Sequence, residues 1–190
     1  TSDAGLTWIS QSSGPTNDLQ SIFFIDAKNG FAVGLNGVII KTTDGGINWT
    51  LLTEGVFPWL TEVYFIDADS GYAVGYSGTI LKTTDGGTNW SLQNSGTNYF
   101  LRSIYFITSQ IGWIVGDHII LKTTNGGANW SSQNSGNLYW LESVYFIDDQ
   151  TGWAVGYGCI LKTTNGGTDW TLQNNGAGVW LESVYFLNNY

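Results

Sequence analysis

The stretch KTTDGGINW, residues 41–49, decides the fold of this chain, because near-copies of it follow at 82–90, 122–130 and 162–170. Each copy holds a Thr, an Asp or Asn, two glycines and a Trp in the same order. An Asp or Asn side chain accepts hydrogen bonds from backbone N–H groups that a tight turn leaves unpaired, and Gly supplies left-handed φ. We therefore interpret the stretch as a turn that locks itself, with the Trp covering it and anchoring it in the core.

The exchange of Asp for Asn in the later copies favours a structural role for this motif. Asn still accepts the same hydrogen bonds, whereas a catalytic carboxylate or a metal ligand would lose its charge. A fifth copy, TSDAGLTW, opens the chain at residues 1–8. The residues assigned to the structural motif are Asp3, Gly5, Trp8, Asp44, Gly46, Trp49, Asp85, Gly87, Trp90, Asn125, Gly127, Trp130, Asn165, Gly167 and Trp170.

Outward from this motif, the whole chain repeats with a period near 40 residues. The leucine that opens each unit falls at Leu19, Leu60, Leu101, Leu141 and Leu181, at spacings of 41, 41, 40 and 40. Each unit contains four short apolar or alternating runs, such as SVYFI, GWAVG, TILKT and NWSLQ. Four antiparallel strands in a repeat of this length predict an all-β fold, a β-propeller with one four-stranded antiparallel blade per unit.

The composition agrees with an all-β fold. The chain has 190 residues, of which 26 are Gly, 10 Trp, 10 Tyr and 9 Phe. Aromatic residues are enriched in strands, and frequent glycines indicate tight turns between short elements. Asn36-Gly37 and Ser77-Gly78 predict hairpin turns with positive φ between the second and third strands.

The two ends of the sequence predict how the propeller closes. We expect one domain, residues 1–190, in which residues 1–18 end the blade that begins at 181. Joined in this way, the ends would make a fifth blade that lacks its middle hairpin. Three interpretations remain open: a five-bladed ring with one incomplete blade, an excerpt from a longer propeller, or a hairpin supplied by another chain. The unpaired edge of the last strand is a candidate for self-association.

The motif resembles the Asp-box, or BNR repeat, of sialidase-type and sortilin-type propellers. The whole unit, with SVYFID, GWAVG and ILKTTDGGTNW, is similar to the repeats of photosystem II stability/assembly factor-like propellers. The resemblance covers nearly the whole chain and implies a propeller fold. It further implies an exported protein, periplasmic, cell-surface or extracellular, with an assembly-factor-like chaperone role as one option. Propellers host many unrelated activities, so the fold alone does not give the function.

Charge and hydropathy limit the partners. The formal net charge is −9, which repels nucleic acid and anionic lipid because phosphate binding needs clustered Lys and Arg. No stretch approaches 18 uninterrupted apolar residues, so we expect no membrane insertion.

Catalysis, metals and cofactors are not predicted. The sialidase resemblance implies three arginines that clamp a substrate carboxylate, but Arg102 is the only arginine. His118 is the only histidine, and the sequence places it as an exposed residue at a hairpin tip. Zinc usually needs two or more His or Cys ligands, and the loop acids lack the rest of an EF-hand motif.

The best binding candidates are the aromatic residues that precede each first strand. The connections that carry them run from the outermost strand of one blade to the innermost strand of the next, so we expect them on one face around the axis. Packing between blades is the alternative role for the same rings. The candidate ligand-binding residues are Trp59, Phe100, Tyr139, Trp140, Trp180, Glu142 and Glu182.

From these patterns we expect a non-catalytic binding or scaffold propeller that presents an aromatic, acidic face to a protein or peptide. The alternative is a multivalent lectin with sugar sites at the blade junctions.

Overall fold

The computed structural model describes residues 1, 4–14, 17–135, 139–173 and 178–187. Within them, four sheets of four strands follow one another, and each sheet is one sequence repeat with its strands paired in chain order. All the strand pairs are antiparallel. The predicted fold class is therefore confirmed. No helix in the described part of the chain is long and apolar enough to cross a membrane.

The blades are numbered 1 to 4 in chain order. Blade 1 comprises β1 (Leu19–Phe24), β2 (Gly30–Gly34), β3 (Ile39–Thr42) and β4 (Thr50–Thr53). Blade 2 comprises β5 (Leu60–Phe65), β6 (Gly71–Gly75), β7 (Ile80–Thr83) and β8 (Ser91–Gln93). Blade 3 comprises β9 (Leu101–Phe106), β10 (Gly112–Gly116), β11 (Ile119–Thr123) and β12 (Ser131–Ser132). Blade 4 comprises β13 (Leu141–Phe146), β14 (Gly152–Gly156), β15 (Cys159–Thr163) and β16 (Thr171–Gln173).

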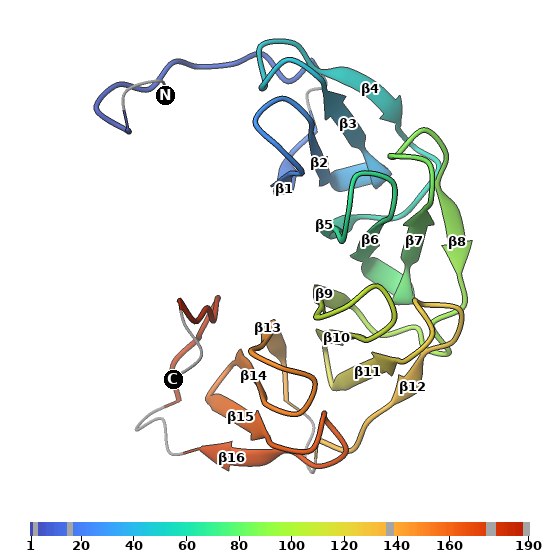
Figure 1. Ribbon diagram of the computed structural model, residues 1–190, viewed down its shortest axis with the longest axis vertical. Coiled ribbons are helices and arrows are strands. Elements are labelled where there is room, and N and C mark those ends of the chain that lie inside the picture. The colour runs from blue at the N-terminus through green and yellow to red at the C-terminus, as the bar shows by residue number, and fades with distance from the viewer. Residues whose placement is uncertain (2–3, 15–16, 136–138, 174–177, 188–190) are drawn as a thin grey trace.

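The blades stand in an arc, with the first strand of each blade on the inner side and the fourth on the outer side (Figure 1). Short 3-10 turns at Leu35–Gly37 and Tyr76–Gly78 join the second and third strands of blades 1 and 2. Asn36 and Gly37 both have positive φ, 56° and 65°, which is the conformation that the sequence predicts for this turn.

The Asp-box turn is held by hydrogen bonds among its own residues. The Thr42 Oγ1 atom accepts the Gly46 N–H at 2.9 Å and donates to the Asp44 carboxylate at 2.9 Å. The same carboxylate accepts the backbone N–H of Asn48 at 2.9 Å. Asn125 repeats this contact with the Asn129 N–H at 2.9 Å, so the amide replaces the acid without loss of the bond. These side chains thus contact their own local main chain.

The core lies between successive blades. At each junction an aromatic residue of the second strand stacks on the last aromatic residue of the next blade's first strand. The ring centroids are 4.4 Å apart for Phe31 and Phe65 and 3.5 Å apart for Trp113 and Phe146. The Asp-box Trp90 packs edge-on against both Phe31 and Phe65, which explains why a turn residue is aromatic in every repeat. Trp90 thus connects the Asp-box turn to the junction between two blades, in addition to covering the turn as the sequence predicts.

Lysine side chains bridge the same junctions, at the end of the blades that carries the Asp-box turns. The Nζ atom of Lys41 donates to the carbonyl of Gly86, in the Asp-box of the next blade, at 2.7 Å. Lys82 and Lys122 make the equivalent bonds to Gly126 and Gly166, also at 2.7 Å. Each ammonium also lies over the aromatic ring of its own second strand.

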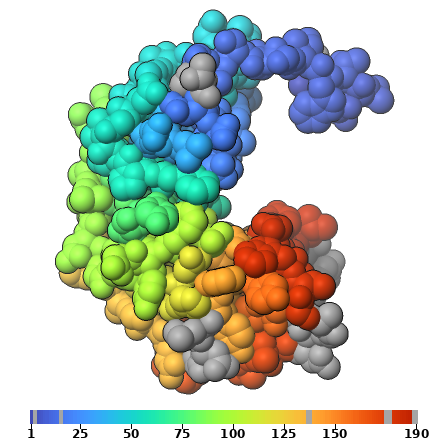
Figure 2. All heavy atoms as spheres, turned by 180° about the vertical axis from the view of Figure 1, so that it is seen from behind, coloured from blue at the N-terminus to red at the C-terminus, as the bar shows by residue number. Residues whose placement is uncertain are grey.

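Among the described residues, the fifth blade predicted from residues 1–18 and the segment from 181 does not form a sheet. The described residues of the two segments belong to none of the sheets, and they lie apart on either side of a wide opening (Figures 1 and 2). The blade topology gives the reason. The first strand pairs only with the second and the fourth only with the third, so two end strands without the middle pair share no hydrogen-bonding partner.

The described residues of the end segments nevertheless keep some of the contacts seen in the other repeats. The Gly5 N–H donates to the Thr1 Oγ1 atom at 2.9 Å, as in the other Asp-boxes, while Trp8 is 79 % exposed because no blade lies beside it. Asp3 lies outside the described residues. The Phe186 ring packs 4.2 Å from Trp153, so residues 181–187 take the place of the next inner strand against blade 4.

Candidate functional site

The blade topology gives the propeller two unlike faces. One face carries the Asp-box turns and the loops between first and second strands. The other carries the turns between second and third strands and the connections from each blade to the next, and we call it the aromatic face. Backbone bonds tie its loops together: the N–H of Asp117 donates to the Phe100 carbonyl at 2.8 Å, and the N–H of His118 donates to the Tyr139 carbonyl at 2.8 Å.

A β-bulge marks the start of every first strand on this face. The pairing shifts register between Leu60 and Glu62, and the same shift recurs in the other three blades. Bulges redirect side chains, and these lie immediately after the predicted aromatic positions.

The rings at these positions lie close to one another. The centroids of Trp59 and Phe100 are 5.6 Å apart, and those of Trp140 and Trp180 are 5.9 Å apart. Rings of the second-to-third-strand turns join them, which the sequence analysis did not anticipate. We call the whole set the aromatic band; it comprises Trp59, Tyr76, Tyr99, Phe100, His118, Trp140, Tyr157 and Trp180.

Exposure differs along the band. Tyr76, Tyr99, Trp140, Tyr157 and Trp180 are between 42 % and 53 % exposed. Trp59 and Phe100 are partly buried, as is Tyr139 beside the band, where it packs on the core of the junction between blades 3 and 4. Some of these rings therefore pack against their neighbours, whereas others are accessible at the surface.

His118 is less exposed than the sequence predicts. It lies at the expected turn with φ of 62°, but it is only partly exposed, because its Nε2 atom accepts the indole N–H of Trp140 at 3.0 Å. Its Nδ1 atom is buried with no hydrogen-bond partner among the described residues. The interaction depends on the register between two blades, which a single repeat does not reveal.

Arg102 joins two carboxylates on this face. Its Nε atom donates to Asp117 at 2.7 Å and its Nη1 atom donates to Glu142, in the next blade, at 3.0 Å. The guanidinium also lies over the Phe100 ring, 4.6 Å from its centroid. The Glu142 side chain is 9 % exposed and its Oε1 atom has no partner among the described residues, whereas Glu182 is exposed.

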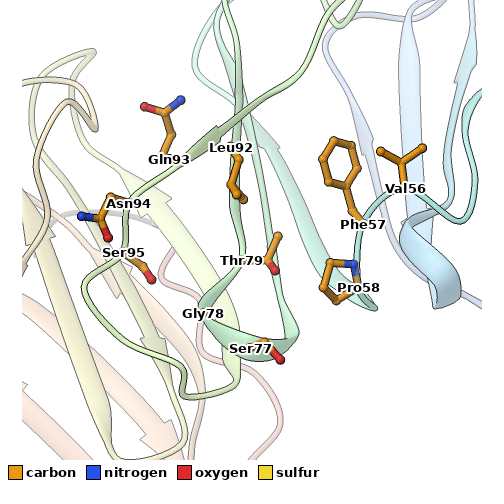
Figure 3. Close-up of a pocket in the computed structure, with 10 residues that line it drawn as sticks. All are labelled: Val56, Phe57, Pro58, Ser77, Gly78, Thr79, Leu92, Gln93, Asn94 and Ser95. Carbon is orange, nitrogen blue, oxygen red and sulfur yellow. The ribbon is translucent and has the colours of Figure 1, made fainter.

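An open groove lies beside the band at blade 2, with a volume of about 610 Å³ (Figure 3). Val56, Phe57 and Pro58, from the connection between blades 1 and 2, form one apolar wall, and Leu92 of β8 projects between this wall and the polar side. Polar atoms come from Ser77, Thr79, Gln93, Asn94 and Ser95. The sequence did not reveal the groove, since its shape depends on how two connections and one turn approach each other.

Glu62 lies on the inner side of the junction between blades 2 and 3. In the other junctions a serine accepts a backbone N–H of the next first strand, as Ser103 does from Val144 at 3.3 Å. Glu62 replaces this serine and accepts the Ile104 N–H at 2.5 Å. Burial raises the pKa of Glu62 to about 7, and hydrogen bonds from Ile104 and Ser103 offset only part of that rise.

The described residues contain no group of three or more His, Cys, Asp or Glu side chains that could hold a metal ion. The aromatic face combines exposed rings, an apolar groove with polar atoms on one side, and carboxylates.

The repeats are similar to those of known propellers. A family model described as photosynthesis system II assembly factor YCF48 matches residues 50–138. A structure of YCF48 bound to D1 peptide is 23 % identical with a TM-score of 0.72, covering 90 % of this chain and 58 % of that one. YCF48 from Cyanidioschyzon merolae is 20 % identical with a TM-score of 0.67, covering 92 % and 62 %. An ancestral GH74 enzyme is 18 % identical with a TM-score of 0.70, covering 86 % of this chain and 25 % of the enzyme.

This chain thus spans about three-fifths of the length of the YCF48 chains, and at these identities the structural similarity establishes the fold alone. No curated protein matches the sequence significantly. Together, the repeat, the four-stranded blades and the matching family model show that the chain is a β-propeller whose BNR-type repeats resemble those of photosystem II assembly factors.

Proposed function

We propose that this chain is a non-catalytic binding propeller that takes an extended peptide or protein segment across its aromatic face. The observation that carries the proposal is the 610 Å³ groove next to a band of half-exposed rings. Pro58 of the groove wall precedes Trp59 of the band, and Ser77 of the groove follows Tyr76, so the two features form one surface.

The chemistry of the groove suits a peptide. Leu92 is 66 % exposed and Val56 is 68 % exposed, so a partner's apolar side chain between them would bury both. The polar atoms opposite can bond to a partner's main chain. Apolar contacts with a few fixed polar groups are typical of sites that bind in one orientation.

The comparisons support this choice of partner. One similar structure is YCF48 bound to D1 peptide, which shows that a related propeller takes a peptide. An assembly-factor-like role, in which the propeller holds a segment of another protein while a complex is built, is the corresponding role for this chain. We extend the proposal to an exported location, for which the family resemblance is the support.

Catalysis has little support on this surface. Arg102 is held by two carboxylates, and the Nε2 atom of His118 is occupied by Trp140. Neither side chain is placed as a free acid, base or anion clamp.

The experiment is a selection of binding peptides from a random library, followed by affinity measurements with two matched variants. Leu92 and Leu172 stand at the same position of their outer strands, β8 and β16, but only Leu92 lines the groove. We expect Leu92→Asp to weaken the selected peptides by roughly tenfold or more, and Leu172→Asp to leave them unchanged. The proposal is refuted if neither Leu92→Asp nor Trp140→Ser changes any selected peptide.

A glycan is the second candidate ligand, because the half-exposed indoles of Trp140 and Trp180 can stack on sugar rings. A glycan array decides between the two: sugar binding that disappears in Trp140→Ala and Trp180→Ala, with the fold intact, would establish a lectin.

A further inference from the structure

We propose that the aromatic face binds an arginine or lysine side chain of its partner between Trp140, Glu142 and Glu182. This inference rests on the proposed function and specifies the chemistry of the peptide. It depends on a comparison of two successive repeats, one of which supplies its own cation.

Arg102 shows how a guanidinium fits this face. It stands two residues after Phe100 and lies over that ring at 4.6 Å. It donates to the carboxylate at the second-to-third-strand turn, Asp117, and to the carboxylate of the next repeat, Glu142. One ring and two acids therefore hold one cation.

The next repeat has the ring and one of the two acids without the cation. Trp140 replaces Phe100, Glu142 stands at the position of Arg102, and Glu182 at that of Glu142, while Tyr157 takes the place of the turn acid Asp117. The Glu142 side chain is nine-tenths buried, and its Oε1 atom has no hydrogen-bond partner among the described residues. One oxygen of Glu142 accepts from Arg102, and leaving the other without a partner is costly, so this second oxygen is suited to a further cation. Glu182 is exposed and can contact that cation directly.

The rings around this position are tilted against one another. The centroids of Trp140, Tyr157 and Trp180 lie 5.0 to 6.3 Å apart, with interplanar angles of 41° to 49°. A cation over the exposed face of such a ring is stabilised.

The charge of the face favours the same partner. Of the six basic residues of the chain, only Arg102 lies on the aromatic face, and two acids already neutralise it. Lys41, Lys82 and Lys122 are bound to Asp-box carbonyls at the opposite end of the blades. The remaining field on the aromatic face is negative, so it attracts a basic peptide and repels an acidic one.

The test uses three blocked pentapeptides with two glycines on each side of arginine, lysine or citrulline. Citrulline has nearly the shape of arginine without its charge. We expect the arginine and lysine peptides to bind the whole chain, with the citrulline peptide weaker by roughly tenfold, as measured by calorimetry and tryptophan fluorescence. Added salt should weaken the charged peptides alone.

Variants locate the site. Glu182→Gln removes one exposed charge from it, and Asp69→Asn removes one exposed charge from the Asp-box face as a control. We expect Glu182→Gln to weaken the arginine peptide several-fold and Asp69→Asn to have no effect. Glu142→Gln should act in the same direction as Glu182→Gln.

Equal affinity for arginine and citrulline, or equal effects of Glu182→Gln and Asp69→Asn, would overturn the inference. A library selection that yields neutral or acidic peptides dependent on Leu92 would also overturn it while leaving the proposed function intact. If no peptide binds this face, the proposed function itself fails.

Discussion

Replacing Glu62 with Gln should remove a pH dependence from the stability of the propeller. The folded pKa of Glu62 is about 7, against an ordinary value of 4.5, because burial disfavours the charged form. Between these pH values the folded chain keeps a proton that the unfolded chain releases. This contribution therefore stabilises the fold at low pH, and it is lost as the pH rises from 4.5 through 7.

The size of the effect follows from the same values. At ~1.4 kcal/mol for each pH unit, the rise of the pKa from 4.5 to about 7 corresponds to about 3 kcal/mol. Gln cannot ionise, but its side-chain oxygen can still accept the Ile104 N–H that Glu62 accepts at 2.5 Å. The difference in the free energy of unfolding between the wild type and Glu62→Gln should therefore fall by about 3 kcal/mol between about pH 4 and pH 8.

Urea unfolding followed by tryptophan fluorescence at a series of pH values measures this difference. Glu182→Gln, at an exposed position, is the control and should run parallel to the wild type. A constant difference between the wild type and Glu62→Gln across this range would refute the argument, because it would mean that the folded and unfolded chains ionise Glu62 alike.

Three further predictions concern the blades. Thr123→Val should lower the free energy of unfolding in urea by about 3 kcal/mol, because the buried hydroxyl accepts the N–H groups of Asn125 and Gly127 and Val leaves both unpaired. A loss under about 1 kcal/mol would contradict this. Gly156→Ala should unfold at markedly lower temperature than Gly178→Ala in calorimetry, since a Cβ at 156 overlaps the Trp140 carbonyl and one at 178 meets open space; equal melting would contradict it. Asp85→Asn should reduce the loss of stability below about pH 4. Hydrogen bonds from Asn89 lower the pKa of Asp85, so the stability that Asp85 contributes is lost as the pH falls through that lowered pKa. Acid unfolding curves of the wild type and the variant that superimpose would contradict this.

The parts of the fold that were predictable from sequence are those held by local bonds. The side-chain bonds that hold the first Asp-box turn lie within the span from Thr42 to Asn48, and the equivalent bond between Thr1 and Gly5 forms even without a blade beside it. The four strands of each unit followed from the repeat, because the repeat is the unit that folds. Whether residues 1–18 and the segment from 181 pair was not predictable from one repeat, since that pairing depends on strands far apart in the chain.

The face of the candidate site was predictable, but its accessible residues were not. Topology places Trp59 and Trp140 at the same position of their blades, yet Trp59 is partly buried and Trp140 is 43 % exposed. The difference comes from neighbours in other repeats: Phe100 packs on Trp59, whereas Trp140 meets His118 and Trp180. A sequence pattern gives the position of a residue within its blade, while exposure depends on the next blade.

The positions that break the repeat therefore carry most of the information about function. A residue that recurs in every unit, such as the Asp-box Thr, serves each blade in the same way and cannot distinguish one junction from another. Arg102, Glu142 and Glu182 occupy one position of three successive units, and the change from a cation to acids leaves the Oε1 atom of Glu142 without a partner in the described chain. The arrangement around Arg102 serves as a reference for the next repeat, where Glu142 replaces the arginine and Tyr157 replaces Asp117. A partner that supplies this charge would complete a pattern that the repeat itself defines.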